Sequence, residues 1–402
     1  MVTSEYIREL GDRSLMHTSR RNPIVLSHGK GVRVWDLDGN EYLDFLAGYA
    51  VNVLGHSHPR VVQAIAEQSG KLLHVSNWFY NEPSVHLARL LVENGAGDRV
   101  FFSPSGAEAI EGAIKLARKY ACRKGNAEKT RVIGAIRSYH GRTYGALAAS
   151  GKPDMREGFG PALAGFTHVP FNDLEALEQA MDHKVCAVIL EPIQGEAGAY
   201  VGSDAFLRGA RELCDRYGSL LIFDEIQTGM GRTGSFFAYQ EYGVKPDILT
   251  IGKGLSGGLP NAAIAAFGEA ASAFQPGDHG ATFGANPVVC AAGVATVQTI
   301  LNENLLDHVK QAGAYLKSQL EALKERHSMI KEVRGKGLLV GLQLSVSSVP
   351  VVAEANKHGL LVAPSLNQVV RILPPLIITK EDVDEAVSIL DYSLRKMAVS
   401  TY

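Results

Sequence analysis

Leu220-Leu-Ile-Phe-Asp-Glu-Ile-Gln-Thr-Gly229 and Pro246-Asp-Ile-Leu-Thr-Ile-Gly-Lys-Gly254 are the two stretches that decide the fold of this chain. Each contains a short, continuous apolar run, which is typical of a strand buried on both faces of a parallel sheet. Polar residues and glycines follow each run directly. Because ligands of open α/β sheets bind outside the carboxyl ends of the strands, the two stretches predict a ligand site in the loops after these strands.

Lys253 ends the second apolar run, where a lysine side chain is not expected to be fully solvated. Partial burial lowers the pKa of an ammonium group, so that a neutral amine becomes available as a nucleophile, as in Schiff-base lysines. Asp224 and Glu225 end the first run, and a carboxylate there could pair with the pyridinium nitrogen of pyridoxal phosphate. Because successive strand side chains face opposite ways, only one of the two can meet such a ring. Taken alone, these residues leave an ordinary surface lysine as the alternative.

The composition is that of an ordinary folded protein of more than one domain. The chain has 402 residues, of which 46% are hydrophobic and 20% are charged, so it can bury several cores. A net charge of -2 without a basic stripe argues against nucleic acid and anionic membranes as partners. The four cysteines are far apart and form no C-x-x-C pair, which argues against a zinc site and against a disulfide framework. With no apolar signal or spanning segment, we expect a cytoplasmic protein.

The order of the predicted elements indicates two architectures. Between about residues 60 and 290, helices alternate with short apolar strands, which predicts an α/β fold with a mostly parallel sheet covered on both faces. The predicted strands are 100–102, 132–136, 185–190, 220–223 and 248–251. After Pro287 the pattern changes to long helices and a few strands, which are predicted at 305–327, 337–342, 369–373 and 381–397.

An alternating pattern around a D-G-N turn predicts a hairpin at residues 32–45, which we expect to complete the C-terminal lobe. The domain prediction is therefore a large domain at 59–288 and a smaller α+β domain formed by residues 1–58 and 289–402.

Three more strand ends carry side chains suited to a ligand. Ser105 and Gly106 stand at the start of a predicted helix, where free N–H groups and the helix dipole favour a phosphate group. An ordinary serine N-cap is the alternative there. Tyr139 could stack on a planar cofactor and Arg142 could bind a carboxylate, although a core tyrosine and a surface arginine are the alternatives. Glu196 lies beyond a glycine and could reach into a cleft.

Two other patterns suggest different chemistry and are weaker. Gly229-Met-Gly-Arg-Thr-Gly234 matches the dinucleotide fingerprint, but polar residues separate it from its strand and the following segment is too short and aromatic for a Rossmann helix. His56 and His58 could bind a metal, but they lie in a turn without further ligands, so structural histidines are expected and no metal site is predicted.

Eight sequence motifs, in a fixed order along the chain, together indicate a family. They are Tyr42-Leu-Asp-Phe-Leu-Ala-Gly-Tyr-Ala-Val-Asn-Val-Leu-Gly-His56, Ser76-Asn-Trp-Phe-Tyr-Asn-Glu-Pro83, Ser105-Gly-Ala-Glu-Ala109, Tyr139-His-Gly-Arg142, Glu191-Pro-Ile-Gln-Gly-Glu196, Asp224-Glu-Ile-Gln-Thr-Gly-Met-Gly-Arg-Thr-Gly234, Gly252-Lys-Gly254 and Thr282-Phe-Gly-Ala-Asn-Pro287. Over nearly its full length, the chain resembles the class III (subgroup II) pyridoxal phosphate-dependent aminotransferases. The resemblance implies fold type I, a large domain with a mostly parallel seven-stranded sheet, and a homodimer with the cofactor near the subunit interface.

The resemblance also implies roles for individual residues. Lys253 would be the Schiff-base and proton-transfer lysine, and Asp224 would pair with the pyridine nitrogen. The other implied cofactor-binding residues are Ser105, Gly106, Ala107, Tyr139, His140, Gln227 and, from the partner subunit, Thr282. Arg142 would bind a substrate carboxylate. Glu196 would neutralise Arg371 while the ω-amine reacts and would swing away when Arg371 takes the α-carboxylate of glutamate.

Within the family the resemblance is greatest to members of arginine biosynthesis, which transfer the δ-amino group of N2-acetylated ornithine to 2-oxoglutarate and form glutamate. Ornithine, succinylornithine, 4-aminobutyrate and carrier-linked aminoadipate semialdehyde are the alternative substrates, and a nicotinamide enzyme or a binding protein without turnover is the alternative class. Pro104, where relatives usually carry asparagine, and Gly257-Gly-Leu-Pro-Asn-Ala-Ala263 depart from the family pattern and could alter cofactor affinity.

Overall fold

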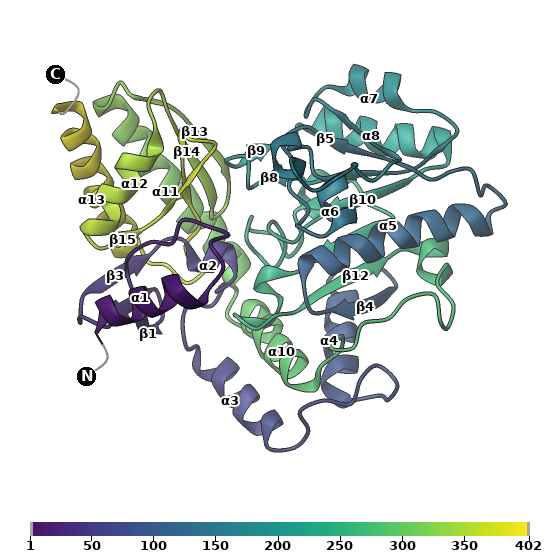
Figure 1. Ribbon diagram of the computed structural model, residues 1–402, viewed down its shortest axis with the longest axis horizontal. Coiled ribbons are helices and arrows are strands. Elements are labelled where there is room, and N and C mark those ends of the chain that lie inside the picture. The colour runs from purple at the N-terminus through teal and green to yellow at the C-terminus, as the bar shows by residue number, and fades with distance from the viewer. Residues whose placement is uncertain (1–2, 400–402) are drawn as a thin grey trace.

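A seven-stranded sheet forms the centre of the computed structural model, which describes residues 3–399 (Figure 1). In sheet order its strands are β4 (Arg99–Ser103), β12 (Ala262–Ala266), β11 (Ile248–Ile251), β10 (Leu220–Asp224), β7 (Val185–Leu190), β5 (Arg131–Ala135) and β6 (Phe166–Val169). Only β12 runs against its neighbours in this described sheet, because β11 and β4 both pair with it in antiparallel register. The predicted α/β fold with a mostly parallel seven-stranded sheet is therefore confirmed.

Helices cover both faces of this sheet. Alternate residues of β10 show the two faces, because Ile222 belongs to the hydrophobic cluster under α5 (Gly106–Arg123), whereas Leu221 and Phe223 belong to the cluster under α8 (Asp204–Tyr217). This alternation sends Asp224 toward the α5 face and the next side chain away from it.

The second lobe contains two four-stranded sheets. One consists of β1 (Leu26–Lys30), β2 (Arg33–Asp36), β3 (Glu41–Asp44) and β15 (Leu360–Leu361), and the other of β13 (Ile330–Lys336), β14 (Leu339–Leu344), β17 (Val369–Ile372) and β16 (Ala363–Ser365). Its helices are α11 (Leu305–Arg326), α12 (Ser348–Lys357) and α13 (Lys380–Val399). The predicted hairpin forms, and its strand β3 pairs in parallel with β15 from the C-terminal part of the chain. The exact domain boundaries stay a prediction.

The remaining elements connect or flank these sheets. They are α1 (Ser4–Ser14), α2 (Ala47–Ala50), α3 (Pro59–Ser69), α4 (Glu82–Glu93), α6 (Tyr144–Ala149), α7 (Leu174–Ala180), α9 (Tyr239–Tyr242), α10 (Pro287–Asn302), the β8–β9 hairpin (Ile193–Gln194 and Tyr200–Val201) and the 3-10 turns Pro153–Arg156, Lys253–Ser256 and Gly268–Ser272. Helix α10 packs on α3 and α4. No helix between residues 3 and 399 combines the length and the apolar character that a membrane crossing requires.

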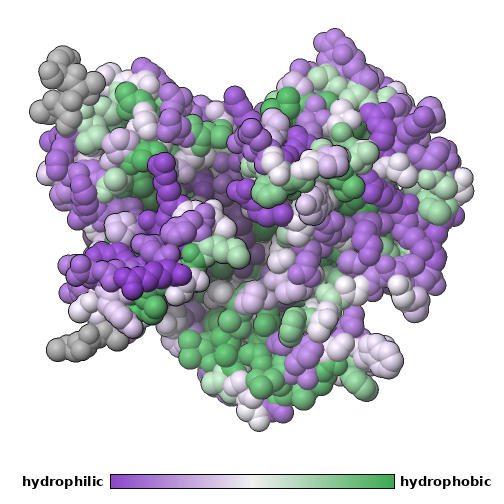
Figure 2. Space-filling view, viewed as in Figure 1, coloured by the Kyte–Doolittle hydropathy of each residue, from purple (hydrophilic) through white to green (hydrophobic). Residues whose placement is uncertain are grey.

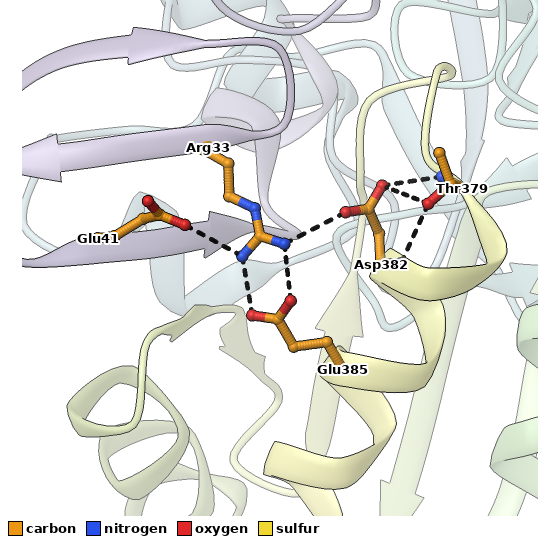
Figure 3. A network of polar contacts seen from close by, with 5 residues as sticks. All are labelled: Arg33, Glu41, Thr379, Asp382 and Glu385. Carbon is orange, nitrogen blue, oxygen red and sulfur yellow. Dashed lines mark hydrogen bonds and ion pairs between the residues drawn. The ribbon is translucent and has the colours of Figure 1, made fainter.

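A cluster of charges joins the N-terminal hairpin to the C-terminal helix (Figure 3). Arg33 on β2 donates two hydrogen bonds to Glu385 on α13, at 2.8 and 2.7 Å. It also lies 3.5 Å from Asp382 and 3.5 Å from Glu41. Asp382 in turn accepts hydrogen bonds from Thr379 at the start of α13. Segments from the two ends of the sequence are thereby fixed to each other.

We expect Arg33→Met to lower the free energy of unfolding by about 1 kcal/mol at pH 7, because the pair is bidentate but partly solvated. Arg33 holds the pKa of Glu385 below its usual range, so this contribution is present at neutral pH and is lost as the pH falls through that lowered pKa. Urea unfolding at pH 7 and near pH 3 measures both effects. Arg13→Met is the control, because Arg13 and Glu9 form an exposed pair at 3.7 Å. If Arg33→Met and Arg13→Met lowered the free energy of unfolding by the same amount, the prediction would be contradicted.

Candidate active site

A cavity of about 300 Å³ lies at the carboxyl ends of β5, β7, β10 and β11. Most of the predicted site residues line it, namely Gly106, Ala107, Tyr139, His140, Arg142, Glu196, Asp224, Gln227 and Lys253. Arg371 joins them through its ion pair with Glu196. Of the predicted residues, Ser105, Thr282 and Arg371 itself are not part of the cavity wall in this chain. The loops after the strands therefore converge as the sequence predicted.

Lys253 follows β11 directly and opens a short 3-10 turn, with a backbone φ of 44°. A non-glycine residue with positive φ is strained, and such strain is concentrated at functional sites. The side chain is partly buried and faces the cavity. Burial lowers the pKa of Lys253, which the carboxylate of Glu196 opposes and the charge of Arg371 reinforces. The position thus favours a neutral amine.

Asp224 is the carboxylate that faces the cavity. Its Oδ2 lies 2.6 Å from Nδ1 of His140, and its Oδ1 accepts hydrogen bonds from the Thr250 hydroxyl and the Ile226 N–H, both at 3.1 Å. Burial by itself lowers the pKa of His140, but the hydrogen bond to Asp224 and the negative charges of Asp224 and Glu191 together outweigh burial and raise it. The Asp224 carboxylate is therefore held in place by three hydrogen-bond partners.

Glu225 is turned to the opposite side of the strand. It accepts hydrogen bonds from the N–H groups of Ala238 and Tyr239, both at 2.7 Å, and from the Thr228 hydroxyl at 3.0 Å. The question that the sequence left open between the two acids is thereby decided by the pleat of β10 in favour of Asp224.

Glu191 adds an acid that the sequence alone did not single out as functional. It ends β7, lines the cavity and accepts a hydrogen bond from the backbone N–H of Tyr139 at 3.1 Å. Burial raises its pKa to about 7, which His140 partly offsets. The carboxyl group fixes the Tyr139 loop against the neighbouring strand.

The N-terminus of α5 forms one wall of the cavity. Ser105 is the N-cap, and its hydroxyl accepts a hydrogen bond from the N–H of Glu108 at 3.3 Å, so the N-cap alternative is correct for its side chain. A Cβ at Gly106 would lie 2.9 Å from Cδ1 of Ile226, so a side chain there would require Ile226 to shift. Thr282 lies in an exposed turn away from this wall.

Unsatisfied polar atoms around the cavity match a planar, anionic ligand. Within residues 3–399, both amide atoms of Gln227 and Nε2 of His140 are buried without a hydrogen-bond partner. Buried polar atoms are rarely left unpaired, so such groups indicate a missing partner. A carboxylate, an unpartnered amide, an aromatic ring and a helix N-terminus in one cavity fit pyridoxal phosphate.

Glu196 and Arg371 form a buried ion pair at 2.8 Å beside this cavity. The Arg371 guanidinium is 3% exposed and the Glu196 carboxylate 27%. Tyr49, which the sequence did not predict as a site residue, lies under Arg371 with 4.9 Å between the guanidinium carbon and the ring centre. Its φ of 66° belongs to a left-handed turn. Lys152, also unpredicted, lies 5.7 Å from the Tyr139 ring centre.

The two weaker patterns have structural explanations. The loop of the G-x-G-x-x-G match is buried, and the helix that follows it, α9, has only 4 residues, which does not suit a dinucleotide. Arg232 of this loop donates hydrogen bonds to the carbonyl groups of Leu338 and Pro374 in the other lobe. His56 pairs with Asp44 at 2.7 Å, which confirms a structural histidine.

Known proteins are similar to this chain in sequence. The profile of "Aminotransferase class-III" matches residues 15–394. The chain is 50% identical to the acetylornithine aminotransferase of Caldanaerobacter subterraneus subsp. tengcongensis, covering 94% of this chain and 96% of that protein. It is 48% identical to the acetylornithine aminotransferase of Methanocaldococcus jannaschii, covering 92% and 93%.

Solved structures are similar over the whole chain. The ornithine aminotransferase from Toxoplasma gondii superposes with a TM-score of 0.95 at 36% identity, covering 100% of this chain and 97% of that one. A second structure of that enzyme has pyridoxal phosphate in partial occupancy at its active site. The acetylornithine aminotransferase from Elizabethkingia anophelis has a TM-score of 0.88 at 35% identity, covering 98% and 100%. Fold type I is thereby confirmed, and the chain belongs to the class-III aminotransferases, the pyridoxal phosphate-dependent family whose motifs its sequence carries.

Proposed function

We propose that this chain is an acetylornithine aminotransferase, which transfers the δ-amino group of N2-acetylornithine to 2-oxoglutarate and gives N-acetylglutamate 5-semialdehyde and glutamate. The names of the relatives at 50% and 48% identity support the donor. The observation that carries the proposal is the Glu196–Arg371 pair beside Lys253, because one site must accept an ω-amine and an α-carboxylate in turn.

Pyridoxal phosphate, when bound, supplies an electrophilic carbonyl group and a ring that withdraws electrons from the reacting carbon. We propose that Lys253 would hold the carbonyl group of the cofactor and that its neutral amine would accept and return the proton of the reacting substrate carbon. Asp224, supported by His140, would pair with the ring nitrogen, and the amide of Gln227 would bind the ring hydroxyl. Tyr139 would stack on the ring. Ser105, Gly106, Ala107 and Thr282 of the partner subunit would bind the phosphate group.

In our proposal, two arginines bind the substrate carboxylates. Arg142 lines the cavity and binds the carboxylate of the amine donor, and bidentate geometry suits this contact. Glu196 neutralises Arg371 while the donor reacts, since the donor has no carboxylate at the reacting carbon. When glutamate or 2-oxoglutarate binds, Glu196 moves away and Arg371 takes the α-carboxylate.

A homodimer completes this site in our proposal. Exposed aromatic side chains occur in two segments that meet near Thr282. Phe283 is 62% exposed, and Trp78, Phe79 and Tyr80, which are 87%, 67% and 98% exposed, precede Asn81, whose amide donates a hydrogen bond to the Ala285 carbonyl group. Figure 2 shows a hydrophobic surface below the large sheet, around α10 of Figure 1. Apolar surfaces of this kind mark protein interfaces. Trp78→Glu should halve the mass measured by equilibrium sedimentation, and an unchanged dimer would contradict the proposed interface.

We also propose that the enzyme works in the cytoplasm, in arginine biosynthesis. All four cysteines are free thiols, and three of them are buried, which supports a reducing cytoplasm. Arginine biosynthesis follows from the proposed donor and product.

A panel of amine donors tests the proposed function directly. Acetylornithine, ornithine, succinylornithine and 4-aminobutyrate are compared at equal concentration with 2-oxoglutarate, and glutamate formation is measured. We expect acetylornithine to have the highest kcat/KM. Ornithine is the second candidate, because the Toxoplasma gondii ornithine aminotransferase superposes with a TM-score of 0.95. A higher kcat/KM for ornithine would replace our proposal with that activity.

A further inference from the structure

Lys152 is a partly buried cation beside the cavity that has no role in the reaction described above. Its Nζ lies 5.7 Å from the centre of the Tyr139 ring, and Tyr139 and Glu196 line the same cavity. Among residues 3–399, no carboxylate forms an ion pair with Lys152. Burial lowers the pKa of Lys152, and Glu196 is the first of the charges that oppose this lowering. An ammonium group without an ion-pair partner among these residues therefore lies over the Tyr139 ring, which lines the same cavity as Glu196.

The proposed switch leaves Glu196 without its partner during part of the cycle. Its carboxylate is held at 2.8 Å by Arg371, which is 3% exposed. When Arg371 binds a substrate carboxylate, Glu196 must separate from it. Removing one partner from a buried ion pair is strongly destabilising, because the remaining charge is left uncompensated. A second cation would therefore stabilise the partly exposed Glu196 carboxylate at this stage.

Three cations act on Glu196, and one of them is suited to pair with it after it leaves Arg371. Burial raises the pKa of Glu196, but the positive charges of Arg371, Lys253 and Lys152 lower it more. Arg371 is occupied by the substrate at this stage. Lys253 must be neutral to accept a proton, so it cannot supply a permanent positive charge. Lys152 is the remaining cation of the three.

We propose that Lys152 is the positioning residue that pairs with Glu196 when Glu196 leaves Arg371, and that it thereby keeps Arg371 free for dicarboxylate substrates. This inference rests on the proposed function. The carboxylate of Glu196 is 27% exposed, which leaves it room to turn. Lys152 follows Gly151, which bridges Ile136 just before the Tyr139 loop, so its backbone is anchored while its flexible stem can follow Glu196.

Lys152→Met removes the charge and keeps an unbranched apolar side chain. We expect kcat/KM for glutamate, divided by kcat/KM for acetylornithine, to fall about 10-fold, because only glutamate requires Glu196 to leave Arg371. The two half-reactions are followed separately by the absorbance of the cofactor. Lys152→Arg keeps the charge and should restore the ratio. Lys245→Met is the matched control, because Lys245 also lies over an aromatic ring, 4.7 Å from the centre of Phe267, but at the amino end of β11.

A binding measurement on the apoprotein complements the rates. Glutarate has two carboxylates and no reactive carbonyl group, and calorimetry should show its Kd raised about 10-fold by Lys152→Met. Two outcomes would overturn the role of Lys152. One is that Lys152→Met lowers kcat/KM equally for glutamate and acetylornithine, and the other is that it leaves the glutarate Kd unchanged while its unfolding midpoint is normal. Arg371→Met separates the two proposals. If it leaves glutarate binding intact, the switch itself is wrong, whereas a loss with Arg371→Met but not with Lys152→Met rejects only the role of Lys152.

Discussion

Lys253→Ala is expected to lower kcat by about 10³-fold or more, because it removes both a nucleophile and a proton carrier. The structure gives the physical reason. Lys253 is partly buried in a strained backbone conformation, and burial lowers its pKa so that a neutral amine is available. No other lysine lines the cavity in the described part of the chain. Turnover of acetylornithine and 2-oxoglutarate, with stopped-flow measurement of each half-reaction, gives the size of the loss.

Lys253→Arg is the control for charge and volume. An arginine remains protonated at all working pH values, so it should be nearly as inactive as alanine although it fills the space. Hydride reduction followed by peptide mass analysis should locate the cofactor on the peptide of Lys253 in the wild type and on no peptide of either variant. Cofactor trapped at another lysine, or a kcat within about 10-fold of wild type in Lys253→Ala, would refute the assignment.

Asp224→Asn should lower kcat by roughly 10²–10³-fold, because it removes one partner of a buried charge pair. The amide can still accept the hydrogen bonds of Thr250 and Ile226, so the backbone geometry is kept. The pKa of His140 should fall, since burial lowers it and the Asp224 carboxylate is the group that raises it. We expect the Kd of the cofactor, measured by equilibrium dialysis, to change less than kcat, because the α5 wall is untouched.

Glu225→Gln is the matched control for Asp224→Asn. It removes the same charge one residue further along, where the side chain binds Thr228, Ala238 and Tyr239 instead of facing the cavity. Its kcat should stay within about 3-fold of wild type, even if the protein is less stable. A loss in Glu225→Gln as large as that in Asp224→Asn would show that Asp224 acts only by holding the fold.

The strands that the sequence predicted are the ones with uninterrupted apolar runs. Residues 185–190 and 248–251 form β7 and β11 with those bounds, because strands buried on both faces need apolar side chains at every position. Two strands of the sheet were missed. β12 is Ala-Ala-Ile-Ala-Ala and β6 is Phe-Thr-His-Val, and neither composition indicates a strand by itself. Pairing with β11 and β5 in the completed sheet decides their conformation.

The residues of the candidate site also fall into those that the sequence could predict and those that it could not. Lys253, Asp224 and the start of α5 could be predicted, because each directly follows a strand whose end must lie at one edge of the sheet. Lys152 and Tyr49 could not be predicted, because neither residue directly follows an apolar strand of the large sheet. They reach the site through a bridge to Ile136 and a left-handed turn under Arg371.

The sequence by itself determined the α/β fold, the family and most of the cavity wall, since apolar runs and the polar residues that end them are local features. The apolar runs and loop residues alone did not decide that Asp224 and not Glu225 faces the cavity, or that Glu196 meets Arg371 from another lobe. The family resemblance implied both, and the tertiary structure shows how they arise. The physical reason is that side-chain direction and contacts between distant segments depend on packing. Strand pleat, helix burial and ion pairing are fixed together only when the whole chain has folded.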